Sequence, residues 1–146
     1  MSTSTQVDPR GLRVAAAITS VVLAVVLVLD SPVREIVLAV QVGVFALAVV
    51  LGLQASPYSI FFRSVIRPRL GAPTQTEDSR PPRFAQLVGL LFTTGALLAF
   101  VLGATTVGLV LTAFALVAAL LNATVGLCLG CEMYLALRRL RPASVA

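Results

Sequence analysis

The chain has 146 residues, of which 58% are hydrophobic and only 12% are charged, and its mean hydropathy is +1.00. Soluble domains carry about 25% charged residues, so the composition predicts a single integral membrane domain over residues 1–146. The net charge of +5 comes from arginines that flank apolar runs, which indicates membrane topology and no nucleic-acid partner. Without histidine, and with two cysteines that make only half of a four-thiolate site, we expect no metal site and no cofactor within one chain.

Four apolar runs are predicted to cross a bilayer as α-helices, which takes about 20 apolar residues each. They cover about residues 14–29, 36–53, 84–102 and 107–127, and the last is expected to continue as one helix to residue 137. Ser31 is the expected cap of the second helix and Pro32 its first residue. A signal peptide is the alternative for the first run, but small cleavage-site residues are missing after Leu29. The pattern predicts an all-α membrane protein with a four-transmembrane-helix bundle.

The segment between the second and third runs begins with Ser56 and Pro57, a second cap-then-proline signature. In Tyr58–Arg67, four apolar side chains fall on one helical face and two arginines on another, which predicts a short interfacial helix in the headgroup layer. A plain basic loop is the alternative. Pro68 is expected to end this helix at the preceding residue, and the proline-rich stretch Leu70–Arg83 is expected to be an exposed connection.

Arginine is distributed unequally between the two ends of the predicted spans. Ten of the 11 basic residues precede the first run, lie in the long loop or follow the last run, and only Arg34 lies on the other side. The positive-inside rule therefore predicts a multi-pass cell-membrane protein, in contact with membrane lipids, whose termini and long loop are cytoplasmic.

The pattern D-x-R-x-x-R-x-A occurs at residues 8–15 and again at residues 78–85, each time just before an apolar run. A parallel two-plus-two repeat explains this spacing and predicts that two arginine pairs lie side by side at the inner membrane face. These pairs, Arg10 with Arg13 and Arg80 with Arg83, are candidates for binding one anionic group or lipid headgroup. A positive-inside collar without a binding role is the alternative.

The only two cysteines, Cys128 and Cys131, form a CxxC pair at the end of the fourth run and are followed by Glu132. A CxxC pair in a cytosolic setting indicates redox or metal chemistry, although cysteine is also an ordinary buried apolar residue. We therefore predict a catalytic site at the cytoplasmic headgroup level, with the two thiols in the dithiol form and Glu132 as proton acceptor.

Helix electrostatics oppose a reactive thiol if the fourth run is one continuous helix. The pair would then lie in the last third of the helix, where the helix dipole disfavours a thiolate. Side chains three residues apart on a regular helix are also too far apart for a relaxed disulfide. Activation therefore requires either a break at Gly126 or Gly130 that restarts a helix at the cysteines, or a charge from a partner. In a continuous helix the two glycines would form a small-xxx-small contact facing away from the thiols.

Four strings together resemble the family called domain of unknown function (DUF) 4395, small bacterial integral membrane proteins. They are Asp8-Pro-Arg-Gly, Ser56-Pro-Tyr58, Glu77-Asp-Ser-Arg-Pro-Pro-Arg-Phe-Ala-Gln86 and Cys128-Leu-Gly-Cys-Glu-Met-Tyr134. The resemblance extends over nearly the whole chain. It implies a protein of the bacterial inner membrane with a CxxC pair, with thioredoxin-like or sulfurtransferase-like partners and a role in sulfur metabolism. Ser56 stands where the family often carries histidine, which puts any role for that position in doubt.

Two classes of function stay open from the sequence. One is a thiol redox or sulfur-relay protein that uses the CxxC pair with a soluble partner. A quinone-linked disulfide reductase of the vitamin K epoxide reductase type is a narrower version, but those enzymes typically carry a second cysteine pair and this chain has none. The other class is a non-enzymatic membrane component, such as a small transporter subunit or an anchor, with structural cysteines. Either one would be compatible with a homo-oligomer.

Overall fold

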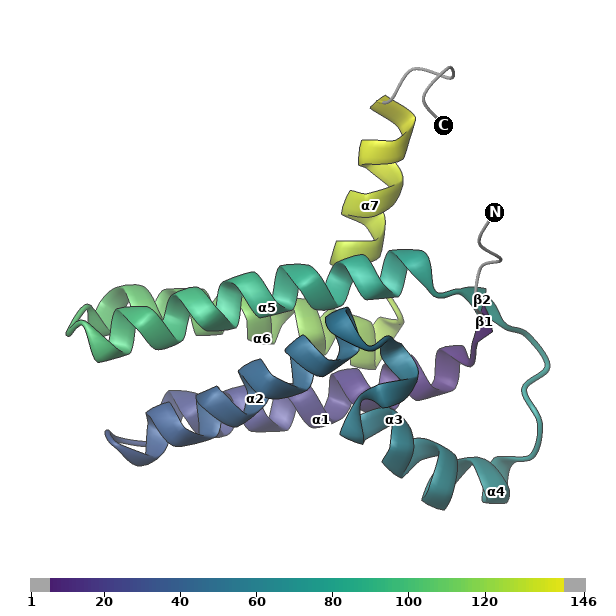
Figure 1. Ribbon diagram of the computed structural model, residues 1–146, viewed down its shortest axis with the longest axis horizontal. Coiled ribbons are helices and arrows are strands. Elements are labelled where there is room, and N and C mark those ends of the chain that lie inside the picture. Colours follow the sequence, from purple (N-terminus) through teal and green to yellow (C-terminus); the bar gives the residue numbers. More distant parts are fainter. Residues whose placement is uncertain (1–5, 141–146) are drawn as a thin grey trace.

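The structure, a computed structural model, describes residues 6–140 and is almost entirely helical (Figure 1). Its main body consists of four long helices, α1 (Pro9–Val28), α2 (Val33–Val50), α5 (Arg80–Val101) and α6 (Thr105–Val125). Each is long and apolar enough to cross a membrane, so the predicted all-α fold with four spans is confirmed. Every one of these helices begins a few residues before the apolar run that predicted it, because the polar residues ahead of each run are already helical.

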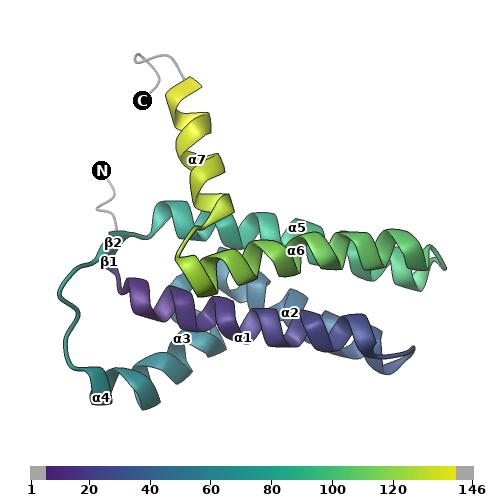
Figure 2. The same ribbon diagram turned by 180° about the vertical axis from the view of Figure 1, so that it is seen from behind.

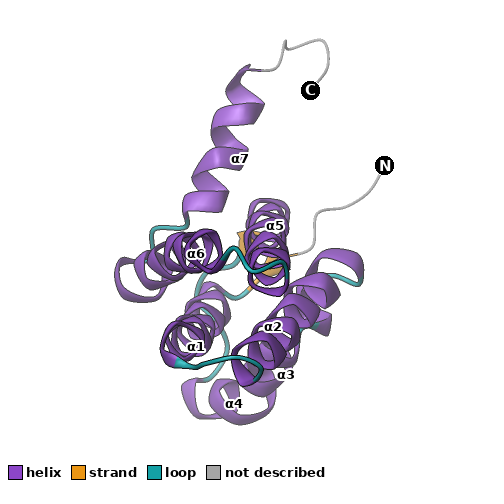
Figure 3. Ribbon diagram, turned by 90° about the vertical axis from the view of Figure 1, so that its left-hand side faces the viewer, coloured by secondary structure: helices purple, strands orange, loops and turns teal. Residues whose placement is uncertain are grey.

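The four helices pack as a ring in which α1 contacts α6 and α2, and α5 contacts α2 and α6. Figure 3 looks along the bundle and shows α5 and α6 on one side of it, with α1 and α2 on the other. A buried cluster near the short turns joins all of these helices, with Leu23, Val26, Leu38, Ala96 and Phe100 at its centre. In lipid, such close packing rather than the exclusion of water holds helices together.

The surface of this bundle is suited to lipid. Large apolar side chains such as Val21 (64% exposed) and Leu91 (63%) point away from the core. Three buried hydroxyl groups inside the spans are satisfied locally. The hydroxyls of Ser20, Thr93 and Thr112 each donate to a backbone carbonyl four residues earlier, at 2.8 Å. Because lipid offers no hydrogen bonds, such internal pairing is required of a helix that crosses a membrane.

A short antiparallel ladder, which the sequence did not predict, ties the two halves of the chain together at the other end of the bundle. Strand β1 (Gln6–Val7) pairs with strand β2 (Glu77–Asp78), with Gln6 opposite Asp78 and Val7 opposite Glu77. Val7 is buried in a second small cluster with Ala48 and Leu53. The ladder thus places the starts of α1 and α5 at the same end of the molecule (Figure 1).

The segment after α2 is helical over most of its length. The 3-10 turn η1 (Leu53–Ala55) leads into α3 (Pro57–Phe61), the π-helical η2 (Phe62–Ile66) and α4 (Arg67–Leu70). Ser56 caps α3 as predicted, since its Oγ accepts the N–H of Tyr58 at 3.3 Å. The predicted end at Arg67 is wrong. Pro68 falls in the first turn of α4, where its missing N–H is not needed.

Two further local predictions are wrong. Ser31 does not cap α2, because Pro32 itself lies directly before Val33 and no side chain caps this helix. The exposed connection is also shorter than Leu70–Arg83, since β2 and the first turn of α5 take up its second half and Pro82 is buried. The tail from Arg141 onward, predicted to be cytoplasmic, lies outside the described residues.

The two halves of the chain make matching contacts. In the first half, α3 and η2 fold back onto the start of α1, where Phe62 lies against Gly11. In the second half, the last helix, α7 (Leu129–Leu140), folds back onto α5. Each half also contributes one helix to each of the pairs α1–α6 and α2–α5. A parallel two-plus-two repeat would account for these contacts and stays a prediction.

Candidate functional site

The fourth span does not continue through the cysteines, so the predicted helix from residue 107 to residue 137 is wrong. Helix α6 ends at Val125, and Gly126 adopts a left-handed conformation with φ +75°. Glycine enters this region without the penalty that a Cβ would bring, and it commonly ends helices for that reason. A separate helix, α7, begins at Leu129 and leaves the bundle crosswise, as Figure 2 shows from behind.

Cys128 lies just before α7, in the position of a helix N-cap. Its carbonyl accepts the N–H of Glu132 at 3.0 Å, the first bond of the helix. Its sulfur accepts the main-chain N–H of Cys131 at 3.2 Å, as the side chain of an N-cap residue does. The two cysteines are joined by a disulfide, with their Cα atoms 5.1 Å apart. The expected dithiol is therefore not the state that the structure records, and the disulfide is accommodated because Cys128 lies outside the regular helix.

The electrostatic surroundings of the pair are the reverse of those predicted for a continuous helix. The positive end of the α7 dipole now faces the sulfurs, while Arg138 and Arg139 lie in its last turn, where the dipole favours cations. Of the routes to activation that the sequence left open, the structure contains the break at Gly126. Glu132 lies in the first turn of α7 with an exposed side chain, where a negative charge also complements the helix dipole.

Two contacts pack the start of α7 against α5. Gly130 lies so close to α5 that a Cβ built on it would be 2.5 Å from both Cα and Cβ of Ala85. One turn further along, the ring of Tyr134 packs against Phe84 with the ring centroids 5.6 Å apart. Of the predicted glycine pair, therefore, only Gly130 makes a close helix contact, and Gly126 instead ends α6.

A cavity of about 320 Å³ lies beside the disulfide, and both cysteines line it. Its walls come from α1, α5, α6 and the start of α7, with Phe45 of α2 and Glu77 of β2, and they are mostly apolar, with Phe45, Phe92 and Phe114 as the largest side chains. Sequence reasoning missed this cavity. The signal that could have revealed it is the run of small residues on α6, since Ala115, Ala118 and Ala119 all face it.

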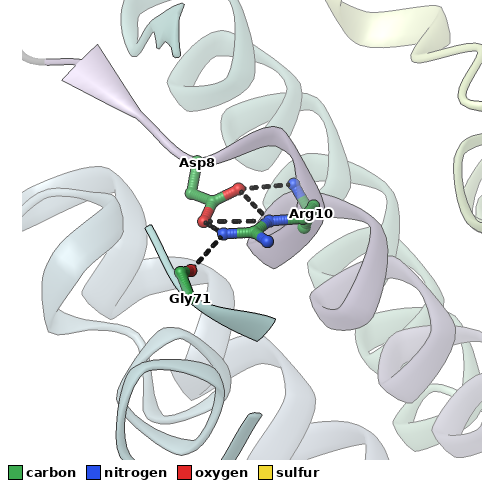
Figure 4. Close-up of polar contacts among 3 residues, drawn as sticks. All are labelled: Asp8, Arg10 and Gly71. Atoms are coloured by element: carbon green, nitrogen blue, oxygen red, sulfur yellow. Dashed lines mark hydrogen bonds and ion pairs between the residues drawn. The ribbon is translucent and has the colours of Figure 1, made fainter. Parts of the chain in front are cut away.

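Arg10 and Arg80 occupy matching positions in the repeated pattern and make matching contacts. The main-chain N–H of Arg10 donates to Oδ1 of Asp8 at 3.0 Å and its Nη2 to Oδ2 at 2.8 Å, while Nη2 also reaches the carbonyl of Gly71 at 3.0 Å (Figure 4). Arg80 contacts Asp78 in the same way, with an N–H bond of 2.9 Å and an Nη2–Oδ2 distance of 2.6 Å. The hydrogen bonds from the arginine side chains lower the pKa of each carboxyl below its usual value.

Arg13 and Arg83 also match, and each bonds the end of a helix from the other half of the chain. Nη2 of Arg13 donates to the carbonyl of Thr124 at 2.8 Å, near the end of α6. Nη2 of Arg83 donates to the carbonyl of Val49 at 2.6 Å, near the end of α2. Cations at helix C-termini satisfy carbonyls and complement the dipole. These contacts assign all four arginines a structural role, and binding of an anion or a lipid headgroup by them stays a prediction.

Comparison with known proteins was consistent with the strings that the sequence analysis singled out. The model of a domain of unknown function (DUF4395) matches residues 7–139, a region that contains the repeated arginine pattern, all four spans and the CxxC pair. No curated protein and no solved structure matched the chain. Because the family model covers almost the whole sequence, the protein belongs to the DUF4395 family.

Proposed function

We propose that the protein is a membrane-bound thiol redox or sulfur-relay protein whose Cys128–Cys131 pair exchanges with a soluble thioredoxin-like or sulfurtransferase-like partner. One observation carries this proposal: α7 begins at the pair, with the sulfur of Cys128 at the N-cap and hydrogen-bonded to the N–H of Cys131. A CxxC motif at the start of a helix is the setting in which protein thiolates are stabilised.

The two cysteines then have different roles. The helix start stabilises Cys128 as a thiolate, which makes it the nucleophile when the reduced pair attacks a partner disulfide. The partner's S–S bond breaks, a mixed disulfide forms at Cys128, and one partner thiolate leaves. The Cys131 thiol loses its proton and its sulfur attacks the sulfur of Cys128. The bond between Cys128 and the partner breaks, the second partner thiolate leaves, and the Cys128–Cys131 disulfide is restored, so the partner has gained two electrons. Each step is reversible, so a reduced partner can pass its electrons to the pair by the same route.

The cytoplasmic face that the arginine distribution predicts supports a soluble partner. The pair lies at the same end of the bundle as the starts of α1 and α5 and as η2 and α4, which hold arginines that predict a cytoplasmic face. Neither cysteine is fully buried. At this level of the membrane, a water-soluble protein can reach the sulfurs while the spans stay in lipid.

Single-cysteine variants test this function. With an oxidised thioredoxin-like protein as the probe, Cys131→Ser is expected to accumulate a mixed disulfide through Cys128, visible as a band that reductant removes. In Cys128→Ser the remaining thiol lacks the N-cap position, so trapping is expected to fall about five- to tenfold. Membrane insertion of both variants serves as the control. Failure of both variants to form the adduct, with normal insertion, would refute the proposed function.

A second candidate is a purely structural disulfide in a non-enzymatic membrane component. It is favoured by the close packing of Gly130 on Ala85 and of Tyr134 on Phe84, because a disulfide beside these contacts would hold the start of α7 in place. In this case reduction should release α7 from α5 without any exchange with a partner. Maleimide labelling of reduced and untreated membranes separates the two candidates, since a structural disulfide stays oxidised in cells.

A further inference from the structure

The cavity beside the disulfide has the properties of a site for a flat, weakly polar molecule that arrives from the membrane. Its volume of about 320 Å³ is at the lower end of the range for small-molecule sites, about 300–1,000 Å³. The aromatic rings of Phe45, Phe92 and Phe114 and several alanines supply much of the lining. The polar side chains in the lining are those of Thr19, Glu77, Gln86 and Asn122, and of these Gln86 and Asn122 provide amide N–H donors.

The cysteine count limits where electrons from the reduced pair can go within the membrane. The chain has two cysteines, and both are in the same disulfide. A second pair that would relay electrons along the chain is therefore missing. An electron acceptor embedded in the membrane must then come into contact with Cys128 or Cys131 itself, and the cavity is where the described structure leaves space for one.

We propose that this cavity binds the ring of an isoprenoid quinone and that the quinone oxidises the Cys128–Cys131 dithiol; the proposal rests on the redox function proposed above. The two thiols give up two electrons and two protons as their S–S bond forms. The quinone takes up both, so that its two carbonyl oxygens become the two hydroxyls of a quinol. The amide groups of Gln86 and Asn122 are the donors available for the quinone oxygens, and the isoprenoid tail extends into lipid between the helices.

A lipid acyl chain is the competing occupant, because it would also fit an apolar wall. It would leave the amide groups of Gln86 and Asn122 facing hydrocarbon, where an unpaired polar group costs free energy. An acyl chain also accepts no electrons, so it would not account for a disulfide in the wall of the cavity. The quinone is favoured on both counts.

Stopped-flow oxidation of the reduced protein tests the electron transfer. The protein in lipid nanodiscs is reduced, freed of reductant and mixed with a decyl-substituted benzoquinone whose ring is fully substituted and therefore adds no thiol. The expected result is one quinol formed and two thiols lost per chain. Ala118→Phe fills the cavity and should slow quinol formation about tenfold or more. The matched control is Val117→Phe at the neighbouring, lipid-facing position (52% exposed), which should leave the rate unchanged. Equal rates in the two variants would overturn the proposal.

Binding is measured separately, because Ala118→Phe can also disturb folding. The chain has no tryptophan, so the fluorescence of a single introduced tryptophan reports quinone binding without a background from other tryptophans. Quenching of Phe92→Trp fluorescence by the oxidised quinone should be saturable, because this position lines the cavity. Phe61→Trp, at an exposed position on α3 (46% exposed), should show only weak quenching that does not saturate. Saturation at neither position, or at both, contradicts a quinone site in the cavity.

Two different results distinguish failure of the quinone site from failure of the proposed thiol function. If the reduced wild-type protein forms mixed disulfides with a thioredoxin-like probe but does not reduce the quinone, the cavity holds something else and the thiol function stands. If it reacts with neither, both proposals fail.

Discussion

At the scale of single residues, the two cysteines are distinguished by their backbone positions rather than by their neighbours in sequence. Cys128 precedes α7 and its sulfur accepts an N–H, whereas Cys131 lies inside the first turn and provides that N–H. The CxxC pair, Glu132 and the two arginine pairs could all be singled out from the sequence. The sequence could not show which thiol would be the nucleophile, because that depends on where the helix begins. The predicted helix ran through the pair and had no beginning there.

Asp8 shows how a single carboxylate holds one of these helix starts. It caps α1 and forms an ion pair with Arg10 at 2.8 Å. Asp8→Ala is expected to lower the free energy of unfolding by about 1 kcal/mol, the usual value of such a cap. Asp8→Asn should cost less, since an asparagine can still accept the N–H of Arg10. Thermal unfolding in nanodiscs at neutral pH measures both.

The same carboxylate predicts a pH dependence. Because the hydrogen bond from Arg10 lowers the pKa of Asp8 below the ordinary value of 3.8, the folded form binds fewer protons than the unfolded one. The contribution of Asp8 is complete above the unfolded pKa and is lost as the pH falls through the folded pKa. The difference in melting temperature between wild type and Asp8→Asn should therefore shrink as the pH falls through and below the ordinary pKa of 3.8. Asp30→Asn, at an exposed position in the opposite turn, is the control, and a constant difference for Asp8→Asn would show that its charge contributes nothing.

At the scale of secondary structure, the hydropathy of the chain predicted all four spans but not the end of the fourth. From residue 107 to residue 127 no charged residue interrupts the apolar run, so hydropathy offered no boundary. The boundary comes from the conformation of Gly126 and from the packing of α7 on α5. In that packing Gly130 contacts Ala85 and Tyr134 contacts Phe84. These contacts join residues far apart in sequence, and no local pattern encodes them.

The packing of α7 on α5 gives a prediction with a matched control. Gly130→Ala places a Cβ 2.5 Å from the backbone of Ala85, so α7 must shift, at a cost of about 1–3 kcal/mol for overpacking. Gly43→Ala adds the same methyl group where nothing lies within 4 Å and should stabilise α2 by about 0.5–1 kcal/mol. Melting temperatures should therefore move in opposite directions. Trypsin cleavage after Arg138 should become faster only in Gly130→Ala. Equal cleavage rates in Gly130→Ala and the wild type would show that Gly130 does not hold α7 against α5.

At the scale of the whole molecule, the repeated arginine pattern relates the two halves of the chain. It predicted that the two halves are arranged alike, and the structure shows matching contacts by Arg10 and Arg80 and crossed contacts by Arg13 and Arg83 to the ends of α6 and α2. The cavity beside the disulfide has one sequence signal, the run of small residues on α6, and that signal alone does not predict a cavity. Residues of α1, α2, α5, α6 and α7 line it, so it depends on how several helices pack together.

The last prediction concerns the orientation of this molecule in the membrane. Within residues 6–140, Arg34 lies near the short turns, whereas the other arginines belong to the opposite end of the bundle, the end of α7 and of the disulfide. The positive-inside rule therefore predicts that a reporter fused after Ala146 is active in the cytoplasm and that one inserted at Gly103 is active only outside. The opposite pair of results would place the disulfide outside the cytoplasm, where it needs no continuous re-oxidation. With the predicted orientation, the pair faces a reducing pool that tends to keep thiols reduced. In that setting the proposed quinone would supply, from the membrane, an oxidant that restores the disulfide, which gives the topology experiment a direct bearing on the role of the cavity.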